Sequence, residues 1–228
     1  MAIVLGLVAG LFTLLGGLFA LRIKRHMALV LGFSAGAVVG VALFDLLPEA
    51  LDLAGARSAP LVLTLAAIGY AAYHLLHRSA ARYAATGGLG AAMMSVHSFL
   101  DGLSIGVSFQ ASAAVGTVVA AAVVAHDLCD GINVVTVVKR GGSDARQAMR
   151  WLFIDATTPV LGAAAATGVR LHDGPLGLAL AVFGGFFLYI GASDLLPASA
   201  REAAGVAPAL MTVLGMAVLY AAVRLAGL

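Results

Sequence analysis

The chain carries very little charge. Charged residues make up 11% of its 228 residues, whereas a soluble domain has roughly 25%. The mean hydropathy is correspondingly high, at +1.05. This composition argues against a soluble domain and indicates a polytopic membrane protein. The net charge is only +2, and the basic residues are scattered through connecting segments, so no nucleic-acid partner is expected.

Cysteine and the familiar catalytic motifs are also scarce. Cys129 is the only cysteine, which excludes a disulfide within the chain. The sequence has no HExxH helix and no ATP-binding loop, and we expect no catalytic elbow among its apolar runs. We therefore do not expect an enzyme. The first apolar run lacks a basic leader and a small-residue cleavage site, so we expect a retained first helix.

Apolar runs of about 20 residues, the length that crosses a hydrocarbon core, recur along nearly the whole chain. They are continuous rather than alternating, which favours helices over a barrel. We predict an all-α, polytopic membrane protein with a single transmembrane domain, 1–228. Its eight transmembrane helices are expected at 2–21, 28–51, 60–77, 88–111, 113–138, 147–169, 175–199 and 207–227.

The distribution of basic residues predicts the orientation. With the N-terminus outside, ten lysines and arginines fall on the inner side: Arg22, Lys24, Arg25, Arg78, Arg82, Lys139, Arg140, Arg146, Arg150 and Arg201. Three fall on the outer side: Arg57, Arg170 and Arg224. Because basic loops stay in the cytoplasm, we expect a multi-pass protein of the plasma (inner) membrane with both termini on the outer side.

Two pairs of repeated motifs indicate hidden symmetry. Asp-Leu-Leu-Pro starts at Asp45 near the end of the second span and at Asp194 near the end of the seventh, on opposite sides of the membrane. His-x-x-x-Asp-Gly starts at His97 in the fourth span and at His126 in the antiparallel fifth. These placements predict a 3+2+3 inverted-repeat arrangement, which is typical of secondary transporters.

The His-x-x-x-Asp-Gly motifs also predict a metal site. A His and an Asp four residues apart share one face of a helix, so two antiparallel helices would bring together His97, Asp101, His126 and Asp130. Imidazole and carboxylate ligands suit zinc, iron, manganese, cobalt or cadmium, and suit magnesium or calcium poorly. Each His-Asp pair could instead satisfy itself, but with Asp127 there are five ionisable groups at membrane depth, and a cation would compensate them.

Other polar residues border the predicted site. Ser98 and Asp127 each follow a motif histidine and could form a second, adjacent position. Asp155 in the sixth span either completes the site, gates it, or is capped by neighbouring threonines. Ser104 and Asn133 continue the polar faces of the fourth and fifth spans.

Three further residues leave alternatives open. Cys129 is either a small buried residue or a soft-metal ligand, and His74 and His77 either collect metal or lie at a solvated helix end.

These features together resemble the ZIP family of divalent-metal transporters, over essentially the whole chain. The matching features are eight spans with outward termini, the paired central motifs, Leu-Pro-Glu after the second span and Asp-Leu-Leu-Pro after the seventh. The chain departs from the family pattern in its central motifs. Leu100 and Cys129 replace the motif prolines, Asp101 and Asp130 replace the motif glutamates, and Ser98 replaces the asparagine. A short basic segment also replaces the family's long His-rich loop.

The resemblance implies alternating access, in which a bundle containing the fourth and fifth spans moves against the other helices. We expect a divalent cation, zinc first and otherwise cadmium, iron, manganese or cobalt, to be the transported substrate. It would enter past Asp45 and Glu49 and leave past Asp194. The partners are then the metal ion and the lipid bilayer, and a homodimer is left open. An intramembrane zinc-dependent hydrolase and a metal-sensing membrane protein without flux are the alternatives.

Overall fold

The computed structural model describes residues 1–18, 26–83, 88–203 and 205–226. Their regular structure is entirely helical. In chain order the elements are α1 (Ala2–Leu18), α3 (Met27–Val41), η2 (Ala42–Leu46), α4 (Leu47–Ala54), η3 (Ala56–Ser58), α5 (Ala59–Tyr83), α6 (Gly88–Ala111), α7 (Ala113–Arg140), α8 (Ala145–Thr167), α9 (Asp173–Tyr189), η5 (Ile190–Leu195), α10 (Leu196–Glu202) and α11 (Val206–Leu225).

Each of the eight expected ranges falls on one helical stretch, because α3–η2–α4 and α9–η5–α10 are each continuous. In the described part of the chain, five stretches are long and apolar enough to cross a membrane: Met27–Ala54, Ala59–Ser79, Ala113–Lys139, Asp173–Glu202 and Val206–Leu225. α1 is apolar but shorter. Several helices extend beyond the apolar runs, since backbone hydrogen bonding continues into the polar flanks.

Some sequence expectations fall outside the described residues. These are the end of the first predicted span, residue 227 of the last, and the inner-side basic residues Arg22, Lys24 and Arg25.

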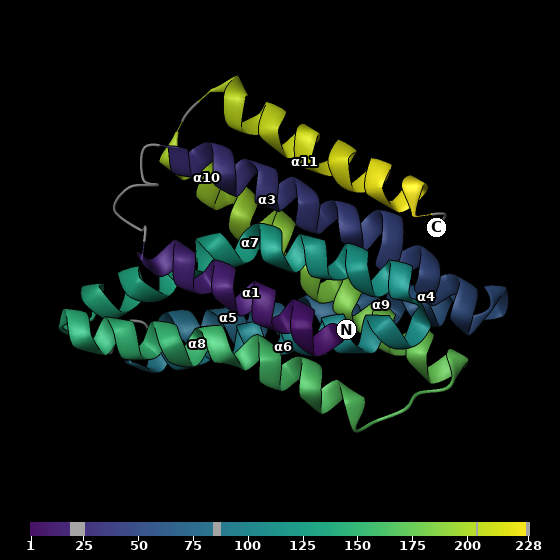
Figure 1. Ribbon diagram of the computed structural model, residues 1–228. Helices are drawn as coiled ribbons and strands as arrows, with labels where there is room; N and C mark the ends of the chain where they lie inside the picture. Colours follow the sequence, from purple (N-terminus) through teal and green to yellow (C-terminus); the bar gives the residue numbers. More distant parts are fainter. Residues whose placement is uncertain (19–25, 84–87, 204, 227–228) are drawn as a thin grey trace.

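The molecule has an apolar exterior and a group of buried carboxylates within a largely apolar interior. Large hydrophobic side chains such as Leu7, Leu63, Phe153 and Leu210 are exposed on the outer helices, whereas several carboxylates are buried at the centre. The many exposed large hydrophobic side chains fit a lipid-facing surface, and buried carboxylates at membrane depth are typical of functional sites. The start of α1 and the end of α11 both lie toward the right of Figure 1, the side on which α4 ends.

The helices pack as two bundles. In the motif bundle, α1 and α6 each pack against α7 and α8. In the flanking bundle, α3 packs against α11 and α10, and α9 packs against α5 and α4. α7 contacts α3, and α6 contacts α5 and α9, so the two motif helices lie where the bundles meet. Figure 1 shows α11 and α3 above and α1 and α8 below, with α7 between them.

Each Asp-Leu-Leu-Pro motif lies at a π-helical turn. Asp45 is in η2 and Asp194 in η5, and Pro48 and Pro197 are each the second residue of the next α-helix. A proline lacks an N–H and its ring clashes with the carbonyl four residues earlier. That carbonyl lies inside the π-helical turn in both cases, so the wider turn accommodates the proline without ending the helix.

Candidate metal centre

The central cluster is built by α6 and α7, which run antiparallel and are joined through the single residue Ser112. The Ser112 hydroxyl accepts a hydrogen bond from Val115 N at 3.0 Å and so caps α7. The tight connection fixes the register of the two helices. Consequently the two His-x-x-x-Asp pairs lie at the same depth and face each other.

The glycine of each motif lets its helix approach a neighbour closely. A Cβ on Gly102 would lie 1.9 Å from the Pro159 carbonyl oxygen of α8, and a Cβ on Gly131 would lie 1.9 Å from the Thr13 carbonyl oxygen of α1. No other residue type fits at these crossings without moving a backbone. Each motif thus places two polar side chains and one backbone contact on a single helix.

Four side chains converge at the centre. His97 Nε2 lies 3.2 Å from Asp101 Oδ2 on its own helix and 3.0 Å from Asp130 Oδ2 on α7. His126 Nε2 lies 3.4 Å from Asp101 Oδ2 and 3.6 Å from Asp130 Oδ2. One ligand atom from each residue lies within 4.8 Å of the other three. The structure therefore brings together the four side chains that the two motifs pair.

The spacing of these atoms fits a small divalent cation. A tetrahedral zinc with bonds of about 2.0–2.1 Å holds its ligand atoms about 3.3–3.4 Å apart. The four N–O separations range from 3.0 to 3.6 Å around that value. Asp101 Oδ2 and His126 Nε2 have no hydrogen-bond partner among the described residues, although they are 3.4 Å apart. This is the arrangement expected when two ligand atoms face a shared centre rather than each other.

Both histidines are oriented through Nδ1. His126 Nδ1 lies 3.0 Å from the Ala122 carbonyl oxygen, one turn earlier in α7. Because a carbonyl can only accept, Nδ1 carries the hydrogen and Nε2 keeps a lone pair for a metal. His97 Nδ1 is hydrogen-bonded to the hydroxyl group of Tyr73 on α5. This arrangement directs Nε2 of both rings toward the carboxylates.

Two more carboxylates border the cluster. Asp127 is fully buried, and its Oδ1 lies 4.0 Å from His126 Nε2. Asp155 on α8 is also fully buried, and its Oδ2 accepts a hydrogen bond from Ser98 Oγ at 3.1 Å. In the described structure both oxygens of Asp127 and Oδ1 of Asp155 have no hydrogen-bond partner. Buried carboxylates of this kind require a cation or protons.

Thr157 and Thr158 do not cap the Asp155 side chain. Both hydroxyls donate to backbone carbonyls, of Ile154 and Asp155 respectively, at 2.7 Å. The alternative in which these threonines satisfy the carboxylate is therefore wrong.

The residues expected to line a pathway lie in different environments. Ser104 is buried and donates to the Asp101 backbone carbonyl at 2.7 Å, while Asn133 is exposed and is not part of the central cluster. Asp45 is buried in η2, with no hydrogen-bond partner for either carboxylate oxygen in the described residues. Glu49 is half-buried on α4. Asp194 in η5 is partly exposed and lies 3.9 Å from His77 Nε2.

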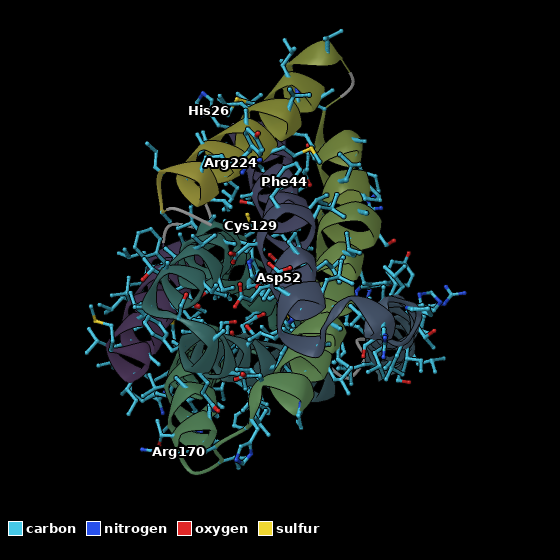
Figure 2. The ribbon with its side chains drawn as sticks, turned by 90° about the vertical axis from the view of Figure 1, so that its right-hand side faces the viewer. His26, Phe44, Asp52, Cys129, Arg170 and Arg224 are labelled. Carbon is cyan, nitrogen blue, oxygen red and sulfur yellow. The ribbon has the colours of Figure 1, made fainter. Side chains whose placement is uncertain are left out.

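His74 and His77 contact an aromatic residue rather than the central cluster. Their Nδ1 atoms lie 3.4 and 2.8 Å from the Tyr189 hydroxyl. Cys129 is buried between α7 and its neighbours. Figure 2 shows Cys129 in the middle of the molecule, whereas Arg170 lies at its lower edge.

Two residues of the site were missed by sequence reasoning. Tyr73 contacts His97, and Ser34 on α3 donates to the Ala125 carbonyl, immediately before His126, at 2.5 Å. Tyr73 lies one helical turn before His77, but nothing in that spacing indicates a contact with α6. Contacts between distant helices depend on packing and leave no local pattern.

Comparison with known proteins identifies the family. The family described as ZIP zinc transporter matches residues 76–222, a stretch that contains both central motifs. Human zinc transporter ZIP4 is 33% identical over 104 residues, which are 46% of this chain and 16% of the relative. Human zinc transporter ZIP10 is 31% identical over 103 residues, 45% of this chain and 12% of the relative.

A third relative matches over a longer stretch. Mouse zinc transporter SLC39A7 is 29% identical over 140 residues, 58% of this chain and 29% of the relative. The matched stretches thus span less than a third of each of these relatives. All three are named as transporters rather than enzymes, in agreement with the sequence analysis. With its apolar helices and the family match over most of its length, this multi-pass membrane protein belongs to the ZIP family.

Proposed function

We propose that the protein transports a divalent cation across the membrane, with zinc as the expected substrate and His97, Asp101, His126 and Asp130 as its ligands. The observation that carries the proposal is the convergence of these four ligand atoms within 4.8 Å in the interior of an apolar bundle. Two imidazoles and two carboxylates are borderline ligands that suit zinc. Cadmium, iron, manganese and cobalt are chemically compatible with the same set.

Ser98, Asp127 and Asp155 extend this site toward a second ion. The cluster contains four buried carboxylates, those of Asp101, Asp127, Asp130 and Asp155. With neutral histidines, one divalent cation balances only two of the four negative charges. Unbalanced buried charge is costly at membrane depth. A second ion held by Asp127, Asp155 and the Ser98 hydroxyl would balance the remaining two.

The path through the membrane passes the two π-helical turns. Metal would enter past Glu49 and Asp45, because the buried and unpartnered carboxylate of Asp45 can attract a cation. It would leave past Asp194, which is partly exposed near the opposite end of its bundle. Ser104 and Asn133 continue the polar faces of the two motif helices along this path.

The packing of the helices supports the 3+2+3 inverted repeat. The proposed axis exchanges α1 with α8, α3–α4 with α9–α10, α5 with α11, and α6 with α7. Each major contact then has a counterpart: α3 on α11 matches α9 on α5, and α6 on α8 matches α7 on α1. The two π-helical turns exchange as well. Inverted repeats around a midplane site are suited to alternating access.

Alternating access would move the motif bundle against the flanking bundle. The four proposed ligands lie on α6 and α7, and Asp155 lies on α8, so the metal would travel with the motif bundle. Among the described residues, two hydrogen bonds join the bundles: the one between Tyr73 and His97 and the one from Ser34 to the Ala125 carbonyl. Few hydrogen bonds would therefore have to break if the bundles slid past each other.

Uptake of radioactive zinc into proteoliposomes tests the proposal. We expect His97→Ala and Asp130→Ala each to lower uptake at least tenfold, because each removes a ligand. His172→Ala is the matched control, since His172 is exposed at the start of α9 and has no side-chain capping bond. Wild-type uptake by both ligand variants would refute the proposal. Zinc binding without flux would instead support a sensor, and turnover of lipid or amide substrates would support a hydrolase.

A further inference from the structure

We propose that Tyr73 is a positioning residue that holds His97 in its metal-binding form and makes the affinity of the site depend on how the two bundles are packed. This inference rests on the proposed function, because it concerns the same four ligands. Tyr73 belongs to α5 in the flanking bundle, whereas His97 belongs to α6 in the motif bundle. The contact therefore crosses the interface that alternating access would move.

The two ring nitrogens of His97 have different partners. Nε2 faces Asp130 at 3.0 Å and Asp101 at 3.2 Å, within the cluster. Nδ1 is hydrogen-bonded to the Tyr73 hydroxyl, and the two rings meet edge to face with centroids 5.5 Å apart. Tyr73 itself is buried and packs against Phe186 and Tyr189 of α9. Its hydroxyl is thus held in place by its own bundle.

This geometry assigns the direction of the hydrogen bond when metal is bound. A metal on Nε2 takes the lone pair of that nitrogen, so the neutral ring must carry its hydrogen on Nδ1. Nδ1 then donates and the Tyr73 oxygen accepts. Phenylalanine at position 73 would keep the ring but leave this N–H without an acceptor. Loss of such an orienting partner typically lowers metal affinity about 10–100-fold.

The Nδ1 partner of the second histidine lies in its own bundle. His126 Nδ1 bonds to the Ala122 carbonyl of its own helix at 3.0 Å, so this contact moves with α7. The proposed symmetry also predicts which residue of the flanking bundle corresponds to Tyr73. Gly36 of α3 packs on Thr212 of α11, and its counterpart Gly185 of α9 packs on Ala66 of α5. Thr212 therefore corresponds to Ala66. Leu219, seven residues after Thr212, then corresponds to Tyr73, seven residues after Ala66. A leucine has no hydrogen-bonding group, so the pseudo-symmetry is broken at this position.

The broken symmetry has a consequence for transport. If the motif bundle slides, His126 keeps its orienting partner, but His97 separates from Tyr73. The site then binds metal more tightly in the arrangement seen here than in one where the two residues are apart. A difference in affinity between states favours release of the metal from the state that binds it more weakly.

Tyr73→Phe is the test, with Tyr70→Phe as its matched control. Tyr70 lies on the same helix, and its hydroxyl contacts Ser193 Oγ at 2.6 Å instead of a ligand. We expect Tyr73→Phe to raise the zinc Kd, measured by chelator competition, and the KM for uptake about 10–100-fold while Vmax is retained. We expect Tyr70→Phe to leave the Kd unchanged. Thermal unfolding in detergent should be the same for both variants.

A spectroscopic measurement reports the contact without transport. In zinc-loaded protein labelled with ¹⁵N-histidine, we expect a slowly exchanging Nδ1–H on His97 in the wild type and a rapidly exchanging one in Tyr73→Phe. The inference is overturned if Kd, KM and proton exchange are those of the wild type. If His97→Ala also binds zinc normally, the proposed function itself fails. If His97→Ala loses zinc while Tyr73→Phe does not, only the role of Tyr73 is refuted.

Discussion

At the residue scale, the central problem of the molecule is buried negative charge. Four carboxylates lie inside an apolar bundle, and four of their eight oxygens are buried without a hydrogen-bond partner among the described residues. Neutral histidines do not offset this charge, and an isolated ionised carboxylate is costly to bury. The bound metal, which is the proposed substrate, is therefore also expected to stabilise the interior.

The charge balance makes the number of bound ions testable. We expect the wild type to bind two zinc ions per chain and Asp155→Asn to bind one, because the substitution removes one of the charges that hold the second ion. Elemental analysis of protein equilibrated with zinc and then desalted gives the stoichiometry. Asp173→Asn is the control, since Asp173 is exposed at the start of α9. One ion in both wild type and Asp155→Asn would contradict the second position.

At the element scale, the helices approach one another closely at several glycines, in addition to packing large apolar side chains between them. In lipid there is no hydrophobic force between helices, so small residues at the crossings matter more than in a soluble core. The motif glycines combine this role with the positioning of the ligands that precede them. Gly102 follows Asp101, and Gly131 follows Asp130.

Adding one methyl group at a crossing should separate the helices. Gly102→Ala would place a Cβ 1.9 Å from the Pro159 oxygen, which requires α6 and α8 to move apart. We expect a loss of stability of about 1–3 kcal/mol or more from overpacking, with a lower midpoint of thermal unfolding in detergent and weaker zinc binding.

Gly174→Ala provides the comparison, because a Cβ on Gly174 of α9 would meet nothing within 4 Å. Alanine is the better helix former, so the unfolding midpoint should be unchanged or higher. Equal stability of Gly102→Ala and Gly174→Ala would show that the crossing tolerates a side chain.

At the scale of the whole molecule, the two bundles meet along α6 and α7, with the cluster at their junction. The start of α1 and the end of α11 lie toward the same side of the molecule (Figure 1), as the eight expected crossings would require. Orientation in the membrane is a separate property, set by the basic loops during insertion. It determines which of Asp45 and Asp194 faces the outside.

Single introduced cysteines test this orientation, since the native Cys129 is buried. Asp52 is exposed near the end of α4 and Arg146 is exposed at the start of α8. We expect a membrane-impermeant maleimide to label Asp52→Cys in intact cells and Arg146→Cys only after permeabilisation. The opposite pattern would reverse the proposed direction of transport through the site.

The sequence predicted the helical architecture and the central four residues well, because both depend on local rules. Hydropathy and length define helices in lipid, and the i, i+4 spacing places His97 with Asp101 and His126 with Asp130 on single faces. The pattern was less informative for Asn133. This residue follows Asp130 by three positions, a spacing that would place both on one helix face, but its side chain is exposed. It also left open whether Thr157 and Thr158 bond to the Asp155 carboxylate. Both hydroxyls donate to backbone carbonyls instead.

The amino-acid sequence by itself determined that the chain crosses a membrane as helices and that two of them carry matching ligand pairs, because composition and short-range periodicity set both. Only the tertiary structure decided which atoms meet: that Asp155 joins Ser98, that Ser34 reaches α7, and that Tyr73 orients one histidine while a carbonyl orients the other. These contacts join residues far apart in the chain. Helix packing determines which residues come into contact, and no local sequence pattern indicates these contacts.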